Sequence, residues 1–430
     1  MDRVVALSKR RGFVYPSSEI YGGLNAVYDY GPYGAALRRN VRNLWWRHNV
    51  ELRDDVVGLE ASILMNPQVW VASGHVAGFT DPLVDCLGTC HKRWRADHLS
   101  GDRCPECGGP LSAPRQFNLM FRTHIGPVED EGAAVYLRPE TAQGMFVDFK
   151  SVLNSMRVRL PFGIAQQGRA FRNEISPGNF IFRLREFELM EIEYFVKPGE
   201  DEAWHERWIA ERHRWYLEEL GVRAAHLRIR AHEEGERAHY AKASTDIEYD
   251  YPFGWGELEG VANRTDFDLR AHQEHSHQDL SYLDQETNER YLPYAIEPAV
   301  GVDRIMVMLL LDAYDEEEVH GETRVLLRLH PNVAPVQVAV MPLSKKETLI
   351  EPAREVQSLL RRRFRVEYDQ TGGNIGRRYR RQDEIGTPYC VTVDFDTLED
   401  RAVTIRERDS MEQERVAIAE LADRLGERLG

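Results

Sequence analysis

The stretch FRNEISPGNFIFRLREFELMEIE, residues 171–193, decides the fold and the site chemistry of this chain. Its apolar spacing is that of two strands joined at Pro177-Gly178-Asn179, and yet it carries three arginines and five glutamates. An ordinary buried hairpin would not bring so many charges close to a core, because a buried charge without a partner is costly. Either the pair is a surface hairpin covered by ion pairs, or it serves a ligand that needs both kinds of charge.

The second interpretation has a definite chemistry. Arginines suit phosphates, because the planar guanidinium offers forked and permanently charged donors. Glutamates suit an ammonium group, whose charge they oppose. A strand pair that carries both therefore predicts a site where an anionic triphosphate meets an amino-acid zwitterion, as in an enzyme that joins ATP to an amino acid.

The composition of the whole chain is that of an ordinary globular protein with two or three domains, since 42% of its 430 residues are hydrophobic. The net charge of −15 excludes nucleic-acid binding by bulk charge, so such a partner would need a local basic surface. The first residues lack the apolar core of a secretory signal. The longest apolar run, Ile305–Leu311, is too short to span a bilayer, so we expect a cytoplasmic protein with no membrane partner.

The order of elements predicts two domains. Residues 1–332 indicate an α+β domain built on a long antiparallel sheet, with a cysteine-rich insertion at 85–112 and a helical insertion at 198–250. Its strands are expected at 134–138, 163–171, 180–195, 254–269 and 291–298, and its helices at 34–50, 202–220 and 301–313. Residues 333–430 alternate as βαβαββα, which predicts a separate α/β domain that ends in a helix over 412–429.

Three segments resemble the signature motifs of class II aminoacyl-tRNA synthetases. FRNE, a loop and RLREF resemble motif 2, EPAVGVDRIMVMLL (297–310) resembles motif 3, and GLEASILMNPQVW (58–70) resembles motif 1. Further stretches are similar to the glycyl-tRNA synthetases of the single-polypeptide, homodimeric type: SEIYGGLNAVYDYGPYG (18–34), YLRPETAQGMFVDFK (136–150), HYAKASTDIEY (239–249), FGWGELEGVANRTDFDL (253–269) and GTPYCVTVDF (386–395). The resemblance covers nearly the whole chain and implies a homodimer that attaches glycine to tRNA(Gly) through glycyl-adenylate.

The resemblance implies that Arg172 and Arg304 are catalytic, with Arg172 at the α-phosphate of ATP and Arg304 at the distal phosphates. It places Glu174 at the adenine amino group, Phe187 against the adenine ring and Glu257 near Mg²⁺, a hard cation that prefers oxygen ligands. The implied ATP site comprises Arg172, Asn173, Glu174, Phe182, Arg183, Leu184, Arg185, Glu186, Phe187, Glu257, Leu258, Gly301, Val302, Asp303 and Arg304.

The implied glycine site comprises Arg95, Glu140, Phe187, Glu188, Leu189, Met190, Glu191, Glu297, Pro298, Ala299, Val300 and Gly301. Glycine has no side chain, so we expect selection through its backbone charges and through a negative, crowded pocket that larger amino acids do not fit. Strand alternation places Glu191 on the face of Arg183 and Arg185 and Glu188 on the other, so Glu188 reaches the same pocket only across a bulge or loop. The family usually has serine at the position of Ala299, and we expect exclusion by volume to preserve selectivity.

Four cysteines, Cys86, Cys90, Cys104 and Cys107, have the spacing of a tetrahedral structural Zn²⁺ site. His91 could replace one of the thiols, and four unligated thiols are the alternative. Clustered cysteines of this kind fit a metal site in a reducing cytoplasm better than a disulfide framework.

Eight arginines between residues 361 and 381 provide the local basic surface that a nucleic-acid partner would need. They are Arg361, Arg362, Arg363, Arg365, Arg377, Arg378, Arg380 and Arg381. By charge alone they could be a solvated helix face, but the resemblance of this domain to the family's anticodon-binding domain favours tRNA. The alternatives to a complete charging enzyme are a paralogue that makes only glycyl-adenylate or diadenosine polyphosphates, and a non-catalytic tRNA-binding module.

Overall fold

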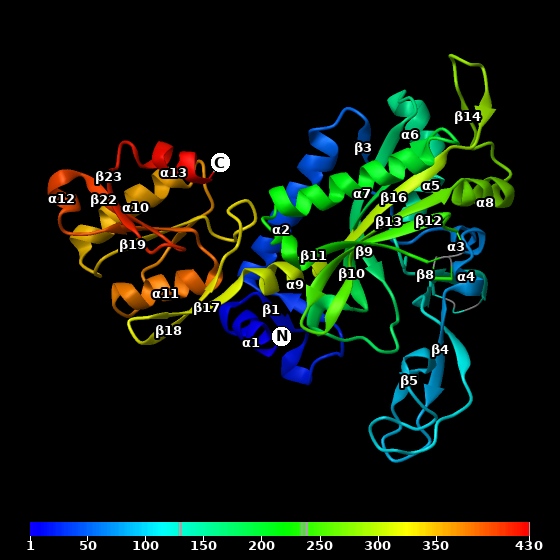
Figure 1. The fold of residues 1–430 in the computed structure, drawn as a ribbon, viewed down its shortest axis with the longest axis horizontal. Coiled ribbons are helices and arrows are strands. Elements are labelled where there is room, and N and C mark those ends of the chain that lie inside the picture. The colour runs from blue at the N-terminus through cyan, green and yellow to red at the C-terminus, as the bar shows by residue number, and fades with distance from the viewer. Residues whose placement is uncertain (128, 130, 234, 237–239, 430) are drawn as a thin grey trace.

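The computed structural model describes residues 1–127, 129, 131–233, 235–236 and 240–429. Parts of the insertion predicted at 198–250, and residue 430 of the C-terminal domain, therefore lie outside the described residues. Figure 1 shows two lobes, a larger one around a long sheet and a smaller one formed by the C-terminal part of the chain. The chain passes between them after strand β18 (Glu322–Leu327) and before strand β19 (Val338–Pro342).

The larger lobe is built on a seven-stranded sheet in the order β11-β12-β13-β16-β10-β9-β3. The bounds are β3 Val56–Gly58, β9 Phe162–Phe171, β10 Glu186–Val196, β11 Leu227–Ala231, β12 Ala243–Tyr251, β13 Gly254–Thr265 and β16 Tyr294–Gly301. All neighbours in it are antiparallel except β3 and β9. This confirms the predicted α+β class with a long antiparallel sheet.

Alternate residues of the central strand β10 enter two different cores. Met190, Ile192 and Tyr194 pack with α2 (Pro32–Trp46), α7 (Asp201–Glu218) and α9 (Val302–Ala313) on one face. Phe195 packs with α5 (Ala142–Val147), α6 (Phe149–Met156) and α8 (Phe267–Ser276) on the other. Because strand side chains alternate, the odd-numbered positions of β10 that precede Phe195 point to the face of α5 and α8.

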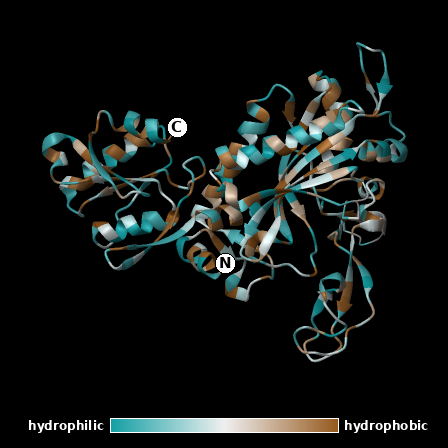
Figure 2. Cartoon of the chain, in the orientation of Figure 1, coloured by the Kyte–Doolittle hydropathy of each residue, from teal (hydrophilic) through white to brown (hydrophobic). Residues whose placement is uncertain are grey.

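The predicted helices over 34–50, 202–220 and 301–313 are present as α2, which continues as a π-helical turn over Arg47–Glu51, and as α7 and α9. The other small elements of this lobe are α1 Asp2–Arg11, β1 Val14–Pro16, β2 Tyr28–Tyr30, α3 Pro67–Ala72, α4 His75–Gly78, β7 Arg122–His124, β8 Ala134–Tyr136, β14 Tyr282–Leu283, β15 Arg290–Tyr291 and β17 Tyr314–Val319. Figure 2 shows brown and white residues mixed with teal ones along the strands of the large sheet.

The prediction of a strand from residue 180 is wrong. Strand β10 begins at Glu186, and residues 172–185 form a loop with a 3-10 turn at Phe180–Phe182. Asn179 and Phe180 have φ of 58° and 62°, a left-handed turn that breaks the extended chain. The two strands are therefore joined by a long loop and not by a tight turn at Pro177-Gly178-Asn179, and Arg183 and Arg185 belong to that loop.

The prediction of a helical insertion at 198–250 is also wrong in part. Among its described residues α7 is the one long helix, while β11 and β12 extend the main sheet as its edge. The predicted strand 254–269 ends at Thr265, because Phe267 already lies in α8. The strand expected at 134–138 is the short β8, which pairs with β7 outside the main sheet.

Three strands, β4 (Thr80–Asp85), β5 (Arg93–Arg95) and β6 (Arg115–Asn118), form a small separate sheet. This sheet carries the cysteine-rich insertion and projects away from the main sheet in Figure 1.

The smaller lobe is an α/β domain with the sheet order β20-β19-β21-β22-β23. Its bounds after β19 are α10 Glu347–Leu360, β20 Val366–Tyr368, α11 Ile375–Ile385, β21 Tyr389–Val393, α12 Thr397–Asp400, β22 Ala402–Glu407, β23 Gln413–Ala417 and α13 Leu421–Leu429. The predicted final helix over 412–429 is wrong for its first part. Residues 413–417 pair with β22 as an edge strand, and the helix begins only at Leu421.

Buried polar contacts hold the two lobes together. Arg324 in β18 donates from Nε to Asp383 in α11 at 2.9 Å, and Arg406 donates to the same carboxylate at 2.9 Å. The hydroxyl of Tyr33 at the start of α2 donates to Glu367 at 2.6 Å. Across the parts of the chain that the structure describes, every helix is too short or too polar to cross a membrane.

Candidate active site

A cavity of about 500 Å³ lies on the face of the main sheet that α5 and α8 cover. Many of the residues predicted for the ATP and glycine sites line it together, although they come from distant parts of the chain. They are Arg95, Glu140, Arg172, Glu174, Phe182, Arg183, Leu184, Phe187, Leu189, Glu191, Glu257, Glu297, Ala299, Gly301, Asp303 and Arg304.

Other residues of the two predicted sets do not line this cavity. They are Asn173, Arg185, Glu186, Glu188, Met190, Leu258, Pro298, Val300 and Val302. The main reason is strand alternation: Met190, Val300 and Leu258 point into the core on the opposite face of the sheet, as does Val302 at the start of α9. Sequence motifs mark continuous segments, whereas a strand presents only every second residue to one side.

Glu188 lies on the opposite side of the sheet from the cavity. Its carboxylate pairs with Arg38 at 3.0 Å and with Arg42 at 3.1 Å, both from α2. Its backbone N–H donates to Asp303 at 2.9 Å. The pairing of β10 with β9 runs without a bulge through this region, so nothing redirects the side chain towards the cavity. This geometry makes Glu188 a link between α2, β10 and α9.

Arg172 follows β9 and lies at one end of the cavity. Its Nε donates to the main-chain oxygen of Pro139 at 3.0 Å. Its guanidinium carbon lies 5.5 Å from the ring centre of Phe79 and 5.3 Å from that of Phe187. No hydrogen bond to a described residue uses its terminal nitrogens, so these donors are available to an anion in the cavity.

Arg304 lies in the first turn of α9 and faces Glu257 across the same end of the cavity. Its Nη1 is 3.0 Å from the carboxylate of Glu257 and donates to the main-chain oxygen of that residue at 3.0 Å. The guanidinium carbon lies 4.6 Å from the ring centre of Phe182. The positive charge of Arg304 lowers the pKa of Glu257, so this carboxylate stays ionised and can neutralise or bind a cation.

The loop 172–185 is closed by its own arginines. The backbone N–H of Arg172 donates to the oxygen of Arg185 at 2.9 Å. The side chain of Arg185 donates to the main-chain oxygens of Asn25 at 2.8 Å and Glu174 at 3.1 Å, which fixes the shape of the loop. Arg183 remains in the cavity, 3.6 Å from the carboxylate of Glu174. Arg185 is therefore a structural residue of the loop, and Arg183 is the one placed to meet a ligand.

The other end of the cavity is acidic. Glu140 contacts Nε2 of His75 at 3.2 Å and accepts a hydrogen bond from Gln143 at 2.9 Å. Burial raises the pKa of Glu140, but the neighbouring His75 and Arg264 outweigh this and hold the pKa below its usual value. Glu140 is thus an ionised carboxylate at the wall of the cavity.

Glu191 and Glu297 complete this acidic end. Glu191 accepts hydrogen bonds from the backbone N–H of Thr141 at 2.9 Å and from its hydroxyl. Glu297 accepts one from Nη1 of Arg264 at 2.8 Å. Burial raises the pKa of both carboxyls, to about 7 for Glu297 despite the opposing charge of Arg264. A cation that enters here meets up to three carboxyl groups.

Sequence reasoning missed the residue that organises this end. Arg264, almost fully buried, donates to both oxygens of Asp268 at 2.8 and 2.9 Å as well as to Glu297. Its guanidinium carbon lies 4.0 Å from the ring centre of Tyr240. The segment FGWGELEGVANRTDFDL contains both Arg264 and Asp268, so their four-residue spacing was the available signal.

Other residues that line the cavity were also missed: Phe79, Asp81, Leu119, Ile181, His232, Glu236, Tyr240, Ser244, Asp246, Gly260 and Ala262. Gly260 and Ala262 lie opposite Ala299 and Glu297 in the register of β13 with β16. Because the side chains of Gly260, Ala262 and Ala299 are small or absent, they leave space in the cavity above the sheet. Arg95 enters from the small sheet and is held at the cavity by Asp81 at 3.0 Å and by Asp97 at 2.6 Å.

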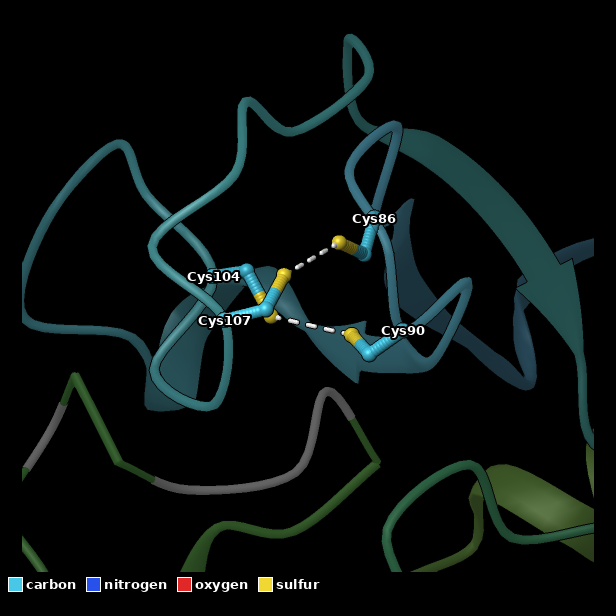
Figure 3. A group of neighbouring side chains, drawn as sticks. All are labelled: Cys86, Cys90, Cys104 and Cys107. Atoms are coloured by element: carbon cyan, nitrogen blue, oxygen red, sulfur yellow. Dashed lines mark hydrogen bonds between the residues drawn. The ribbon is translucent and has the colours of Figure 1, made fainter.

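The four clustered cysteines converge in space. Figure 3 shows Cys86 facing Cys107 and Cys90 facing Cys104, and each of these sulfur pairs is 3.4 Å apart. All four sulfur atoms lie within 4.8 Å of one another. Zn²⁺ with four bonds of ~2.3 Å would hold its sulfurs roughly 3.8 Å apart, so the donor set fits a tetrahedral metal. His91 does not belong to this group of ligand atoms among the described residues.

The arginines of the C-terminal domain divide into two classes. Arg365 donates to the main-chain oxygens of Ala334, Pro331 and Asn332, and the buried Arg378 donates to those of Pro342 and Asp369. These two therefore support the fold. Arg361, Arg362, Arg363 and Arg377 are exposed, and Arg380 and Arg381 are half-buried. Helix α11, which carries Arg377, is mostly hydrophilic in Figure 2.

Two family models match the chain. Residues 121–313 match the class II core domain of tRNA synthetases for G, H, P, S and T, and residues 337–428 match an anticodon-binding domain. A solved prolyl-tRNA synthetase of Cryptosporidium parvum, complexed with L-proline and AMP, superposes with a TM-score of 0.69 at 16% identity, covering 99% of this chain and 74% of that one. At that identity the likeness concerns the fold alone, and it confirms the predicted fold class.

Curated relatives are much closer in sequence. A glycine–tRNA ligase of Bifidobacterium longum (strain NCC 2705) is 56% identical over 458 residues, covering 100% of this chain and 93% of the relative. One of Thermobifida fusca (strain YX) is 54% identical over 455 residues, covering 100% of this chain and 98% of the relative.

Proposed function

The chain belongs to the glycine–tRNA ligase family of class II aminoacyl-tRNA synthetases, which attach glycine to tRNA(Gly) with ATP, and we propose how its residues divide this reaction. The reaction has two steps. The carboxylate of glycine attacks the α-phosphate of ATP and releases pyrophosphate, and the resulting mixed anhydride passes glycine to the terminal adenosine of tRNA. The observation that carries the assignment is the polarity of the cavity, which has arginines at one end and carboxylates at the other.

The arginine end holds ATP in this proposal. Arg172 meets the α-phosphate with its free terminal nitrogens and stabilises the charge that develops there during attack. Arg304 and Arg183 hold the distal phosphates. Phe187, which lies beneath the guanidinium of Arg172, stacks on the adenine, and Glu174 accepts a hydrogen bond from the adenine amino group.

The acidic end holds glycine. Its ammonium group lies among Glu140, Glu191 and Glu297, and its carboxylate faces Arg95 and the α-phosphate. Ala299 lies directly opposite Glu191 in the sheet and forms the wall that excludes a Cβ atom. Glu191 and Glu297 come from neighbouring strands of one sheet, and Arg172 and Arg304 lie just after β9 and β16, so the two substrates are held in a fixed relative position.

Mg²⁺ is the cofactor that the class uses with ATP, and Glu257 is the residue proposed to hold it. The carboxylate of Glu257 is half-exposed and ionised beside Arg304, so it offers the oxygen ligands that the ion prefers. When bound, the ion neutralises charge on the phosphates.

Zn²⁺ is proposed at the four clustered cysteines. The backbone N–H of Gly88 points at the sulfur of Cys86 at 3.3 Å, as donors do around a metal-bound thiolate. Four protein ligands leave no open position, so the metal is structural. It would stabilise the small sheet from which Arg95 enters the cavity.

The exposed arginines of the C-terminal domain are proposed to bind tRNA phosphates. A homodimer and a cytoplasmic location are also proposed. Ile20, Tyr21 and Leu24 lie in the connection between β1 and β2, with 89%, 86% and 61% of their surfaces accessible, and a second subunit would cover them. Free thiols at a metal site suit a reducing compartment.

Amino-acid-dependent exchange of pyrophosphate into ATP, measured without tRNA, tests the proposed adenylation site. We expect exchange with glycine and none with alanine or serine. Exchange with alanine at a comparable rate would show that Ala299 and its neighbours do not exclude a Cβ atom. Exchange without any charging of tRNA(Gly) would instead support the paralogue that makes only the adenylate.

A further inference from the structure

Glu193 is a buried carboxyl that none of the proposed roles uses. It lies in β10 with none of its surface accessible, and neither of its oxygens has a hydrogen-bond partner among the residues that the structure describes. Such a group is costly unless it is neutral or gains a partner, because a carboxylate loses its hydration on burial. Glu193 nevertheless lies directly under the acidic end of the active-site cavity.

The register of the sheet places Glu193 opposite Glu297. The pairs Glu191↔Ala299 and Tyr194↔Ile296 flank this position without a shift between them. Directly opposed residues on antiparallel strands point to the same face with their Cβ atoms about 5 Å apart. Two charged carboxylates at that separation repel each other, and more strongly so away from water.

The groups around Glu193 do not supply a spare cation. Glu297 faces it from β16, Asp268 from α8 and Glu191 from its own strand, and Arg264 is the one cation among these neighbours. Arg264 is already engaged by Asp268 and Glu297. From β9, the position opposite Glu193 is the apolar Ile164. Glu140, His272 and Gln143 lie one step further away around Asp268 and Glu297.

We propose that Glu193 is a positioning residue that shares one proton with Glu297 in the free enzyme, and that this proton is released to solvent when the ammonium of glycine binds. The charge balance supports this coupling. Without substrate, the proton removes the repulsion between the two carboxyls. The bound ammonium brings a positive charge to Glu297, so the proton becomes unnecessary and leaves Glu297 ionised to pair with the ammonium.

Burial raises the pKa of Glu193 well above its usual value, with Glu297 as the next cause, and raises that of Glu297 to about 7. Two carboxyls this close titrate as a pair, and we take the release of the shared proton to follow the pKa of Glu297, the partner that meets the ammonium. The inference rests on the proposed role of Glu297 at the glycine ammonium. It adds that glycine affinity depends on pH through a residue that does not touch glycine.

The test is the KM for glycine in pyrophosphate exchange between pH 6 and 8, for the wild type, Glu193→Gln and the control Glu206→Gln. Glu206 is exposed on α7 and remote from the cavity. We expect the wild-type KM to fall by about tenfold from pH 6 to 8, since one proton with a pKa of about 7 must leave. Glu193→Gln should change less than about twofold, because its amide holds no proton to release, and the control should follow the wild type.

A flat wild-type profile, or a full tenfold change in Glu193→Gln, would overturn the inference. The KM for ATP, measured in parallel, should respond to pH in the same way in all three proteins. If Glu193→Gln altered the pH dependence of the KM for ATP and left that for glycine unchanged, this would count against the inference. Calorimetry of glycine binding in buffers of different ionisation enthalpy counts the released protons directly on the wild type. We expect release of about half a proton per bound glycine at pH 7. If no proton is released, the proposal is refuted, even if the Glu193→Gln variant does not fold. Absence of exchange at every pH would refute the proposed function itself.

Discussion

Replacing Arg172 by glutamine should separate catalysis from stability. The side chain makes one hydrogen bond, to Pro139, and two ring contacts, while its terminal nitrogens face the cavity without a described partner. Losing the hydrogen bond costs about 1 kcal/mol. Each partly exposed ring contact adds about 0.5–1 kcal/mol. The free energy of unfolding should therefore fall by only about 2–3 kcal/mol.

The effect on the first step should be larger. Removing one preorganised donor from a developing negative charge lowers a rate by roughly 10²–10³, about 3–4 kcal/mol. Because the contact is made to the transition state, kcat and kcat/KM for glycine should fall by similar factors. The assay is pyrophosphate exchange with saturating ATP, combined with denaturant unfolding of the same samples.

The matched control is Arg270→Gln, the same chemical change on the exposed face of α8, where Asp266 is the one ion-pair partner of Arg270 among the described residues. It should leave exchange within about twofold of the wild type, because exposed ion pairs contribute little. The reasoning is refuted if Arg172→Gln exchanges pyrophosphate within threefold of the wild type. It also fails if the loss of activity follows a loss of folded protein.

Three further predictions concern other parts of the chain. Replacing the exposed Arg362 and Arg377 by glutamine should weaken tRNA binding. The slope of log binding constant against log salt concentration should fall by about one unit per lost phosphate contact, while tRNA-independent exchange stays unchanged. Equal loss of both activities would point to a folding role. Metal analysis should find one Zn²⁺ per chain in the wild type and in Cys390→Ala, and none in Cys104→Ala. Chelation should lower the melting temperature of the wild type. Metal-free wild-type protein of unchanged stability would exclude the site. The raised pKa of Glu297, about 7 against an ordinary 4.5, means that the folded state keeps a proton that the unfolded state releases. The contribution of Glu297 to stability should therefore be full below about pH 4.5 and be lost, by up to about 3 kcal/mol, as pH rises through 7. The difference in unfolding free energy between the wild type and Glu297→Gln should change by this amount between about pH 4.5 and 8 in denaturant unfolding, and a difference that does not vary with pH would contradict it.

The sequence alone was sufficient for the fold class and for the two charged ends of the site. The α+β class followed from the apolar patterns of the strands that became β9, β10 and β16, and these patterns are local. Arg172 and Arg304 were recognisable because each lies in a short segment with a strong resemblance. The convergence of Cys86, Cys90, Cys104 and Cys107 was predictable because metal ligands close together in sequence need only short turns to meet.

The ends of elements were less predictable. The segment 180–185 has the alternation of a strand, but left-handed residues at Asn179 and Phe180 keep it out of the sheet. Residues 413–417 have apolar spacing that suits a helix, and pairing with β22 makes them a strand. At 180–185 a local turn ends the extended chain, whereas at 413–417 pairing with a remote strand overrides the local preference.

The tertiary structure decided which charged residues serve the cavity. The motif FELME contains both Glu188 and Glu191, and the resemblance implied both for the glycine site. The position of β10 between β9 and β16 turns Glu191 to the cavity. It turns Glu188 to the other face, where it pairs with Arg38 and Arg42. The same register sets Glu193 against Glu297. A sequence determines which side chains are available, but a strand shows alternate residues to opposite faces. Which face is the site depends on the helices that the rest of the chain packs against each side.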